Sequence, residues 1–165
     1  MIISVKEIKN FLISVLIPLV VGYVSNLISN LLSGESAPTY YSQLIKPGFA
    51  PPSYVFPIVW TVLFILMGIS AYMVMRKGSE LPKVSDAMFY YKLQLGLVFL
   101  WSILFFGLDL RLTALIDLII LIIVVVVMIS KFYKVDKRAA YLNIPYLIWL
   151  FYALFLNYFI WIINK

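Results

Sequence analysis

The segment that decides the fold runs from Lys46 to Gly68 and reads KPGFAPPSYVFPIVWTVLFILMG. Its first part is stiff, because Pro47, Pro51 and Pro52 each fix the backbone angle φ and push the preceding residue toward extended conformations. Ser53 follows as a candidate helix N-cap, and a long apolar run begins there. The sequence therefore predicts a rigid loop that leads directly into a helix, and a loop held in this way can act as a lid.

One face of this predicted helix carries large side chains. Residues three or four positions apart lie on the same face of a helix. Phe56, Trp60, Phe64 and Met67 follow one another at spacings of four, four and three residues. We therefore expect an aromatic stripe on the helix, next to the proline-rich segment that would cover it.

The composition places most of the chain in lipid. Of the 165 residues, 64% are hydrophobic and only 12% are charged. A soluble domain of this size has too little interior to bury so much apolar surface. In a bilayer the backbone must satisfy its hydrogen bonds within helices or a closed barrel, and continuous apolar runs favour helices. We predict an all-α integral membrane bundle.

Five apolar runs are long enough to cross a bilayer as helices. We expect one membrane domain over residues 1–165, with a covering loop at 33–52 and spans at residues 10–32, 53–75, 84–106, 112–132 and 139–163. The first run is too long for a signal peptide and lacks an A-x-A-like cleavage site, so we interpret it as a retained helix. Loops as long as 33–52 are usually functional or disordered, and its prolines and aromatic residues favour order.

The basic residues indicate how the chain is oriented. With five spans, the N-terminus and the connections after the second and fourth spans share one side, which carries ten of the thirteen Lys and Arg residues. The other side carries Lys46, Arg111 and Lys165. Cytoplasmic segments hold the excess of positive charge, so we expect a cytoplasmic N-terminus, with the long loop and the C-terminus outside a bacterial cell membrane. These cations act as topology signals, and we expect no nucleic-acid partner.

The composition also excludes several kinds of chemistry. The chain has no cysteine and no histidine, which rules out disulfides, thiol nucleophiles, imidazole acid–base catalysis and the commonest zinc and haem ligands. No general acid–base pair or metal site is evident in the sequence. We therefore predict no catalytic residue, no metal and no obligatory cofactor.

Two further spans carry aromatic and amide residues at helical spacing. The span at 84–106 places Gln94, Trp101 and Phe105 on one stripe, with Val98 between them. The span at 139–163 has a stripe of Tyr146, Trp149, Ala153, Leu156, Asn157, Ile160 and Asn164. Together with Trp60 and Phe64, these stripes can form one aromatic pocket with a few amides, which suits a flat and mostly apolar ligand.

Each of these residues also has a simpler interpretation. Tyr158 and Trp161, near a helix end, fit an interfacial aromatic belt. Gln94 and Asn157 fit hydrogen bonds between helices. Asp117 can serve as a proton-relay carboxylate, but an acid near a helix N-terminus is favoured by the dipole and can extend to the interface, which is the stronger interpretation.

Three blocks of residues resemble the translocator protein family, also called the tryptophan-rich sensory proteins or TspO/MBR family. The resemblance covers nearly the whole chain. Its blocks are Tyr41, Lys46-Pro47-x-Phe49-x-Pro51-Pro52, Phe56, Trp60 and Phe64; then Trp101-Ser102-x-Leu104-Phe105-Phe106 and Ala114-Leu-Ile-Asp117; then Pro145-Tyr146-Leu147-x-Trp149, Leu156-Asn157 and Asn164. The chain departs from the family pattern at Phe49 and Tyr40, where the family has Trp, and at Val98, where it has Asn.

The resemblance implies a five-helix membrane protein, usually a homodimer, with a ligand pocket beneath the first loop. Members of the family bind porphyrins and other tetrapyrroles, sterols in some lineages, and benzodiazepine- or isoquinoline-type ligands. Protoporphyrin IX or haem is then the expected ligand, with a sensory, regulatory or transport outcome. The alternatives are a light-dependent porphyrin-degrading enzyme and a small-molecule transporter. Carried over by position, the pocket residues are Tyr41, Pro51, Phe56, Trp60, Phe64, Trp101, Ser102, Phe105, Trp149, Ala153, Leu156 and Asn157.

Overall fold

A computed structural model describes residues 5–165 and confirms the all-α fold. Of the described residues, 83% are helical and none lies in a strand. Five helical segments are long and apolar enough to cross a membrane, so this is an integral membrane protein. Residues 1–4 lie outside the described range, and with them the predicted start of the domain at residue 1.

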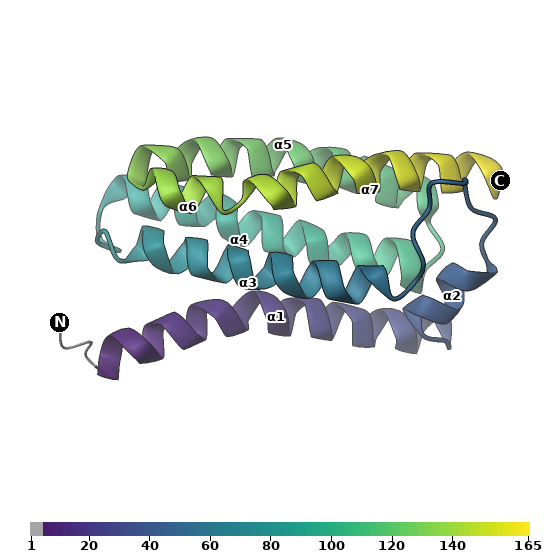
Figure 1. The fold of residues 1–165 in the computed structure, drawn as a ribbon, viewed down its shortest axis with the longest axis horizontal. Helices are drawn as coiled ribbons and strands as arrows, with labels where there is room; N and C mark the ends of the chain where they lie inside the picture. Colours follow the sequence, from purple (N-terminus) through teal and green to yellow (C-terminus); the bar gives the residue numbers. More distant parts are fainter. Residues whose placement is uncertain (1–4) are drawn as a thin grey trace.

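The five long helices run alternately up and down one bundle (Figure 1). They are α1 (Val5–Ser33), α3 (Val55–Met75), α4 (Pro82–Ser102), α5 (Arg111–Val135) and α7 (Ile144–Ile163). Helix α5 packs against both α4 and α7, whereas α1 packs mainly on α3 and on the second half of the third span. We call the end that holds the start of α1 the N-terminal end, and the end that holds the C-terminus the loop end.

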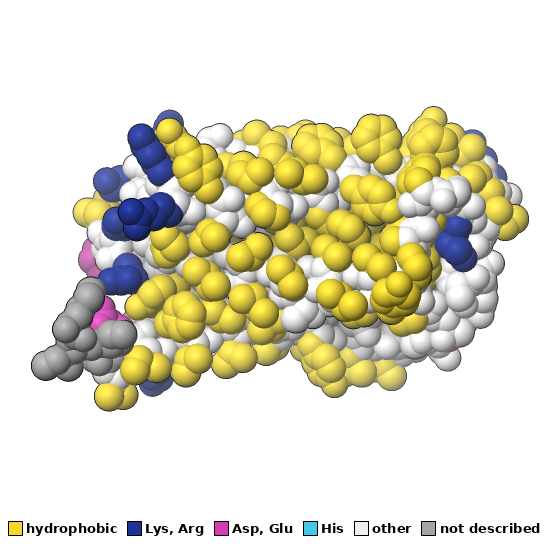
Figure 2. All heavy atoms as spheres, viewed as in Figure 1, with side chains coloured by type: hydrophobic (Ala, Val, Ile, Leu, Met, Phe, Trp, Pro, Cys, Tyr) yellow, Lys and Arg dark blue, Asp and Glu magenta, His cyan; other side chains and the backbone are white. Residues whose placement is uncertain are grey.

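The outer surface of the bundle suits a lipid environment. Apolar side chains cover the middle of the face shown in Figure 2, and most of its Lys and Arg side chains gather at the N-terminal end. Large apolar residues such as Leu16, Ile123 and Ile148 are at least half exposed. In water this surface would favour aggregation, whereas in a bilayer it contacts acyl chains.

Helix α5 supplies the centre of the core. Its most buried residues follow one another at spacings of three, four, three and four, which is the pattern of one helical face. They are Leu118, Leu121, Val125, Met128 and Phe132, and the fully buried Ala114 precedes them by one turn on the same face. This face therefore packs against both α4 and α7.

The loop predicted at 33–52 contains a short helix that the sequence analysis did not anticipate. Helix α2 spans Ala37–Gln43, and the hydroxyl of Ser36 caps it by accepting the N–H of Thr39 at 3.3 Å. Pro38 stands in the first turn, where its missing N–H costs no hydrogen bond. Ser53, in contrast, does not cap α3: the helix begins at Val55, and its N-cap residue makes no side-chain hydrogen bond.

The last span is two helices rather than the continuous one predicted at 139–163. Helix α6 (Lys137–Tyr141) ends before α7 begins at Ile144. Pro145 has no N–H to donate to the carbonyl of Tyr141, so the helical ladder is interrupted there. The side chain of Asn143 occupies the break and donates to Ser70 Oγ at 2.6 Å and to the carbonyl of Ala139 at 3.0 Å.

The third span ends in a π-helical turn, η1 (Ile103–Gly107), which continues α4 directly. The N–H of Leu108 donates to the carbonyl of Ile103 at 2.9 Å, a bond that closes the wider turn. Such turns insert one extra residue and often occur at functional sites. Phe105 and Phe106 belong to this turn, which lies at the loop end of the bundle, where the candidate site is found.

We expect Gly68→Ala to destabilise the protein by about 1–3 kcal/mol, the usual cost of overpacking. A Cβ at this position would lie 2.5 Å from Val15 Cα and 2.6 Å from the carbonyl oxygen of Ser14, so α1 and α3 would have to move apart. Gly96→Ala is the matched control, because its Cβ would meet nothing within 4 Å. Thermal unfolding in detergent measures the effect. Equal stability of the two variants would contradict this packing.

Candidate ligand-binding site

A cavity of about 480 Å³ lies at the loop end, between α1, α3 and the second half of the third span. Its volume falls in the range of small-molecule sites. No charged residue lines it, and its polar groups are hydroxyls and amides such as those of Ser25, Asn26, Thr61 and Ser102. The arrangement therefore suits a mostly apolar ligand that a few hydrogen bonds orient.

Six of the twelve predicted site residues line this cavity. They are Tyr41, Phe56, Trp60, Phe64, Trp101 and Ser102. The ring of Trp60 lies 5.4 Å from that of Phe64 and 6.2 Å from that of Trp101, measured between centroids. These rings form one aromatic wall of the cavity, and aromatic ligands can stack on such rings.

The other six residues lie behind this wall. Phe105 stacks on Trp101 at 5.5 Å, and the side chain of Asn157 accepts the indole N–H of Trp101 at 3.2 Å. Pro51 accepts the hydroxyl of Tyr41 at 3.1 Å through its carbonyl. Ala153 and Leu156 are buried in the core cluster. These residues thus hold the lining residues in place.

Trp149, on α7, is a predicted site residue that packs against the cavity wall. Its ring packs edge-on against Phe56 at 6.0 Å, so one phenyl ring separates it from the cavity. Its indole N–H is buried and has no hydrogen-bond partner among residues 5–165. Trp149 therefore contacts a residue of the cavity wall and does not line the cavity itself.

Helix α1 forms a wall that sequence reasoning missed. Leu19, Gly22, Tyr23, Ser25 and Asn26 all line the cavity. The signal was present in small or polar residues at helical spacing, because the buried residues of α1 are Ser14, Pro18, Ser25 and Ser29. Small residues mark close helix packing in membranes, whereas the predicted site rests on aromatic residues of the other spans.

Gly22 shapes the floor of the cavity. A Cβ at Gly22 would lie 2.2 Å from the ring of Phe64, so only a glycine lets this ring rest against α1. The contact closes the space between α1 and α3 below the cavity. Toward the loop end the two helices leave room between them, and that room is the site.

The open side of the cavity faces the surroundings of the bundle rather than its end. The lining residues Tyr23 and Asn26 of α1, and Pro57 and Thr61 of α3, are all exposed, with Pro38 of α2 at the edge. The antiparallel register of α1 and α3 places Tyr23 opposite Thr61 and Asn26 opposite Pro57. Because these helices cross the membrane, the opening faces lipid.

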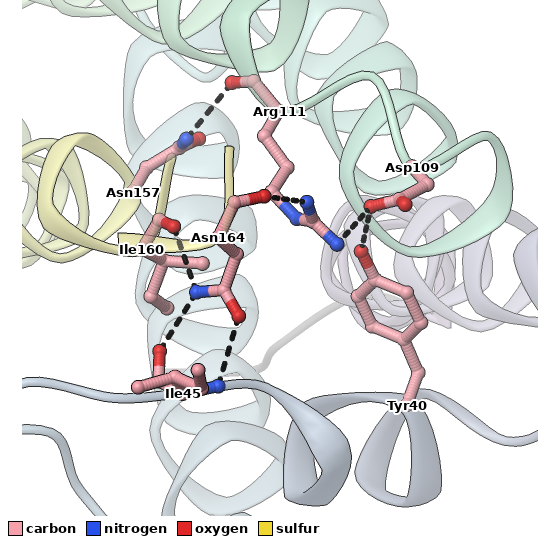
Figure 3. A network of polar contacts seen from close by, with 7 residues as sticks. All are labelled: Tyr40, Ile45, Asp109, Arg111, Asn157, Ile160 and Asn164. Carbon is pink, nitrogen blue, oxygen red and sulfur yellow. Dashed lines mark hydrogen bonds and ion pairs between the residues drawn. The ribbon is translucent and has the colours of Figure 1, made fainter. Parts of the chain in front are cut away.

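The segment between α1 and α3, residues 34–54, covers the loop end, and we call it the roof. A polar network fastens this roof to the bundle (Figure 3). The side chain of Asn164 accepts the N–H of Ile45 at 2.9 Å and donates to the carbonyl of Ile45 at 2.8 Å. Arg111 donates to the carbonyl of Asn164 at 2.8 Å and pairs with Asp109 at 2.6 Å. Asp109 also accepts the hydroxyl of Tyr40, which belongs to α2. The roof is thus tied to α5, α7 and the turn before α5.

Two tyrosines of α2 contribute to the roof from its inner side. Burial and the hydrogen bond to Asp109 raise the pKa of Tyr40 to about 12. Burial, followed by the influence of Tyr152, likewise raises the pKa of Tyr41 to about 12. Both hydroxyls are therefore protonated donors at neutral pH, and the contacts that need the protonated form weaken only as the pH rises through these values.

The three departures from the family pattern lie in different places. Val98 lines the cavity and offers an apolar surface there. Tyr40 takes part in the roof network and does not line the cavity. Phe49 is half exposed and packs on Phe159 at 5.5 Å. Of the three, only Val98 changes the chemistry of the cavity wall.

Asp117 corrects one interpretation of the sequence. Helix α5 begins at Arg111, so Asp117 lies nearly two turns inside it, and its side chain is only 5% exposed. It therefore does not extend to the membrane interface as the dipole interpretation expected. One of its oxygens has no hydrogen-bond partner in the described part of the chain, and it does not line the cavity.

The described residues offer no group of three or more acidic, His or Cys side chains that could hold a metal ion. The candidate site is a cavity lined by aromatic rings and small polar groups, with an open side between α1 and α3.

Comparison with known proteins identifies the family of the chain. The sequence profile of the TspO/MBR family matches residues 14–162. The chain is 38% identical to the tryptophan-rich protein TspO of Archaeoglobus fulgidus, over 92% of this chain and 94% of the relative. It is 34% identical to the corresponding protein of Chlorobaculum tepidum, over 93% and 94%, and 34% identical to the human translocator protein, over 81% and 79%. This chain belongs to the TspO/MBR family.

Proposed function

We propose that this protein binds porphyrins and similar flat, apolar molecules within the membrane, in a sensory, regulatory or transport role. The observation that carries the proposal is the uncharged cavity of about 480 Å³, lined by the adjacent rings of Trp60, Phe64 and Trp101. The names of the relatives, tryptophan-rich sensory protein and translocator protein, fit such a role. Sterols and benzodiazepine-type molecules belong to the same chemical class of ligand.

Protoporphyrin IX or haem is the ligand we propose first. Its ring system would stack on Trp60 and Trp101, and Ser102 would offer a hydroxyl. Its carboxylates would lie toward the headgroup layer at the loop end, near Pro38 and Ser53, because no cation lines the cavity to compensate their charge. Trp149 and Asn157 would support the wall from behind.

Tryptophan fluorescence tests the proposal. Two of the four tryptophans, Trp60 and Trp101, line the cavity, so a bound porphyrin would quench them. Titration of protoporphyrin IX into the purified protein in nanodiscs should give saturable quenching with one ligand per chain. Quenching that grows without saturation, as for a dye that only partitions into lipid, would contradict binding in the cavity.

Light-dependent breakdown of the porphyrin is the second candidate function. The observation that favours it is the pair of oxidisable indoles, Trp60 and Trp101, whose rings lie 6.2 Å apart at the cavity wall. Any such activity would depend on the excited ligand. Porphyrin absorbance under illumination, with and without the protein, tests this function, and the absence of a protein-dependent product would exclude it. Uptake into proteoliposomes tests transport.

Orientation and assembly complete the proposal. The positive charge at the N-terminal end supports a cytoplasmic N-terminus in a bacterial cell membrane, with the roof and the C-terminus outside. The family resemblance supports a homodimer, which light scattering of the detergent-solubilised protein would test.

Cysteine labelling tests the orientation, because the chain has no cysteine of its own. Ser42 and Ser79 are both exposed, at opposite ends of the bundle. In intact cells, a membrane-impermeant maleimide should label Ser42→Cys and leave Ser79→Cys unlabelled until the cells are opened. The reverse pattern would show the opposite orientation.

A further inference from the structure

A second cavity lies at the N-terminal end, far from the candidate site. It measures about 440 Å³ and lies where α3 ends and α6 begins. Its lining residues are Met73, Arg76, Lys77, Asp136 and Arg138. Three cations and one carboxylate give the cavity a net charge of +2, whereas the first cavity is uncharged.

The single carboxylate is already fully engaged. Asp136 pairs with Lys77 at 3.1 Å and accepts the backbone N–H groups of Arg138 and Ala139 at 2.9 and 3.3 Å. Partial burial acts to raise the pKa of Asp136, but the hydrogen bonds from Lys77 and the two N–H groups outweigh it and lower the pKa. Asp136 is therefore charged at neutral pH and neutralises Lys77.

Two arginines remain without an acidic partner in the described part of the chain. Arg76 has only the ring of Tyr72, 5.4 Å away, and Arg138 forms no ion pair. Both arginines line the same cavity. Like charges that share one small space repel each other, and an anion in that space relieves the repulsion.

The backbone that carries these arginines is held in place. The hydroxyl of Ser70 donates to the carbonyl of Ala139 at 2.7 Å, and Asn143 donates to that hydroxyl at 2.6 Å. Ser70, Ala139 and Asn143 are fully buried. These bonds fix α6 against α3, so Arg138 and Arg76 stand on two sides of a formed cleft rather than on mobile loops.

The position of the cleft selects the kind of anion. The second membrane-spanning segment ends at Met75, and the last one begins at Lys137. The cleft between these two ends therefore lies at the depth where apolar helices meet the headgroup layer. Met73 gives it one apolar wall, toward the acyl chains. Basic pockets between helices at this depth bind anionic lipid headgroups.

We propose that this cleft binds the phosphate of an anionic phospholipid. Arg76 and Arg138 contact the phosphate oxygens, since guanidinium groups bind phosphate through paired hydrogen bonds. Lys77 stays with Asp136, and Met73 contacts the glycerol and the first acyl carbons. The site is independent of the ligand cavity at the other end.

Lipid retention in native mass spectrometry tests the proposal. The protein is released from nanodiscs that contain equal amounts of phosphatidylglycerol and phosphatidylcholine. The test variant is Arg76→Gln with Arg138→Gln. The matched control is Lys83→Gln with Lys134→Gln, which removes the same charge from exposed residues of the same end that do not line the cleft.

We expect the wild type and the control to retain one phosphatidylglycerol per chain, and the cleft variant to retain about tenfold less, the loss expected for two charge-assisted contacts. Equal losses in both variants would show general charge attraction and overturn the site, as would a wild type without preference for phosphatidylglycerol. Inorganic phosphate forms the second arm. Thermal stabilisation by phosphate alone, equal to that by phosphatidylglycerol, would overturn the assignment to lipid.

Discussion

Trp60→Ala is expected to weaken the binding of protoporphyrin IX by about tenfold to a hundredfold, since loss of a stacking ring removes about 1–3 kcal/mol. The ring of Trp60 lies in the cavity wall between those of Phe64 and Trp101, so its removal takes away the centre of the stacking surface. Titration of the variant, followed by the Soret absorbance of the porphyrin, measures the loss without relying on the missing indole.

Two other tryptophans serve as graded comparisons. Trp149→Ala should weaken binding less than Trp60→Ala, because Phe56 stands between its ring and the cavity. Trp161→Ala should leave binding unchanged, because this residue packs on Tyr158 near the end of α7 and does not line the cavity. Trp60→Phe should restore part of the affinity. Binding that Trp60→Ala leaves unchanged, in a protein with normal thermal stability, would place the ligand elsewhere.

A cross-link across the open side of the cavity is expected to slow porphyrin association by about tenfold or more, as for a site whose access is gated. Tyr23 of α1 and Thr61 of α3 face each other across this opening, and both are exposed. The chain has no cysteine, so Tyr23→Cys with Thr61→Cys gives a unique pair for a short bismaleimide. Stopped-flow quenching before and after cross-linking measures the rate.

The matched control joins the roof to the bundle. Ile45 and Asn164 share two hydrogen bonds through the Asn164 side chain, and the same reagent on Ile45→Cys with Asn164→Cys replaces these bonds with a covalent link. This cross-link should change the association rate little, because the ligand comes from the lipid side. If the roof cross-link slows association and the cross-link between α1 and α3 does not, the roof is the gate and the ligand comes from water.

The sequence predicted the membrane class and the aromatic face of α3 because both depend on local composition. Long apolar runs are satisfied in lipid as helices whatever their neighbours are. Phe56, Trp60 and Phe64 share one face through helical spacing alone, and all three line the cavity. The prolines before Phe56 correctly indicated an ordered connection. They did not predict the short helix α2 within it.

Features that depend on contacts between helices could not be read in the same way. The break before α7 requires Asn143 to find Ser70 on a different helix. Small residues on α1 indicate close packing, but the contact of Gly22 with the ring of Phe64 depends on a different helix and could not be read from α1. The roof is fastened by Asn164, Arg111 and Asp109, three polar residues near helix ends that resemble ordinary interfacial residues in the sequence.

The most direct test of the account is an experimental structure of the protein with protoporphyrin IX bound in lipid nanodiscs. We predict that the porphyrin ring lies between α1 and α3, against Trp60 and Trp101, with its carboxylates toward the headgroup layer near Ser53. A porphyrin on the lipid-facing surface of α5, or at the N-terminal end beside Arg76, would contradict the central claim that the aromatic cavity under the roof is the binding site.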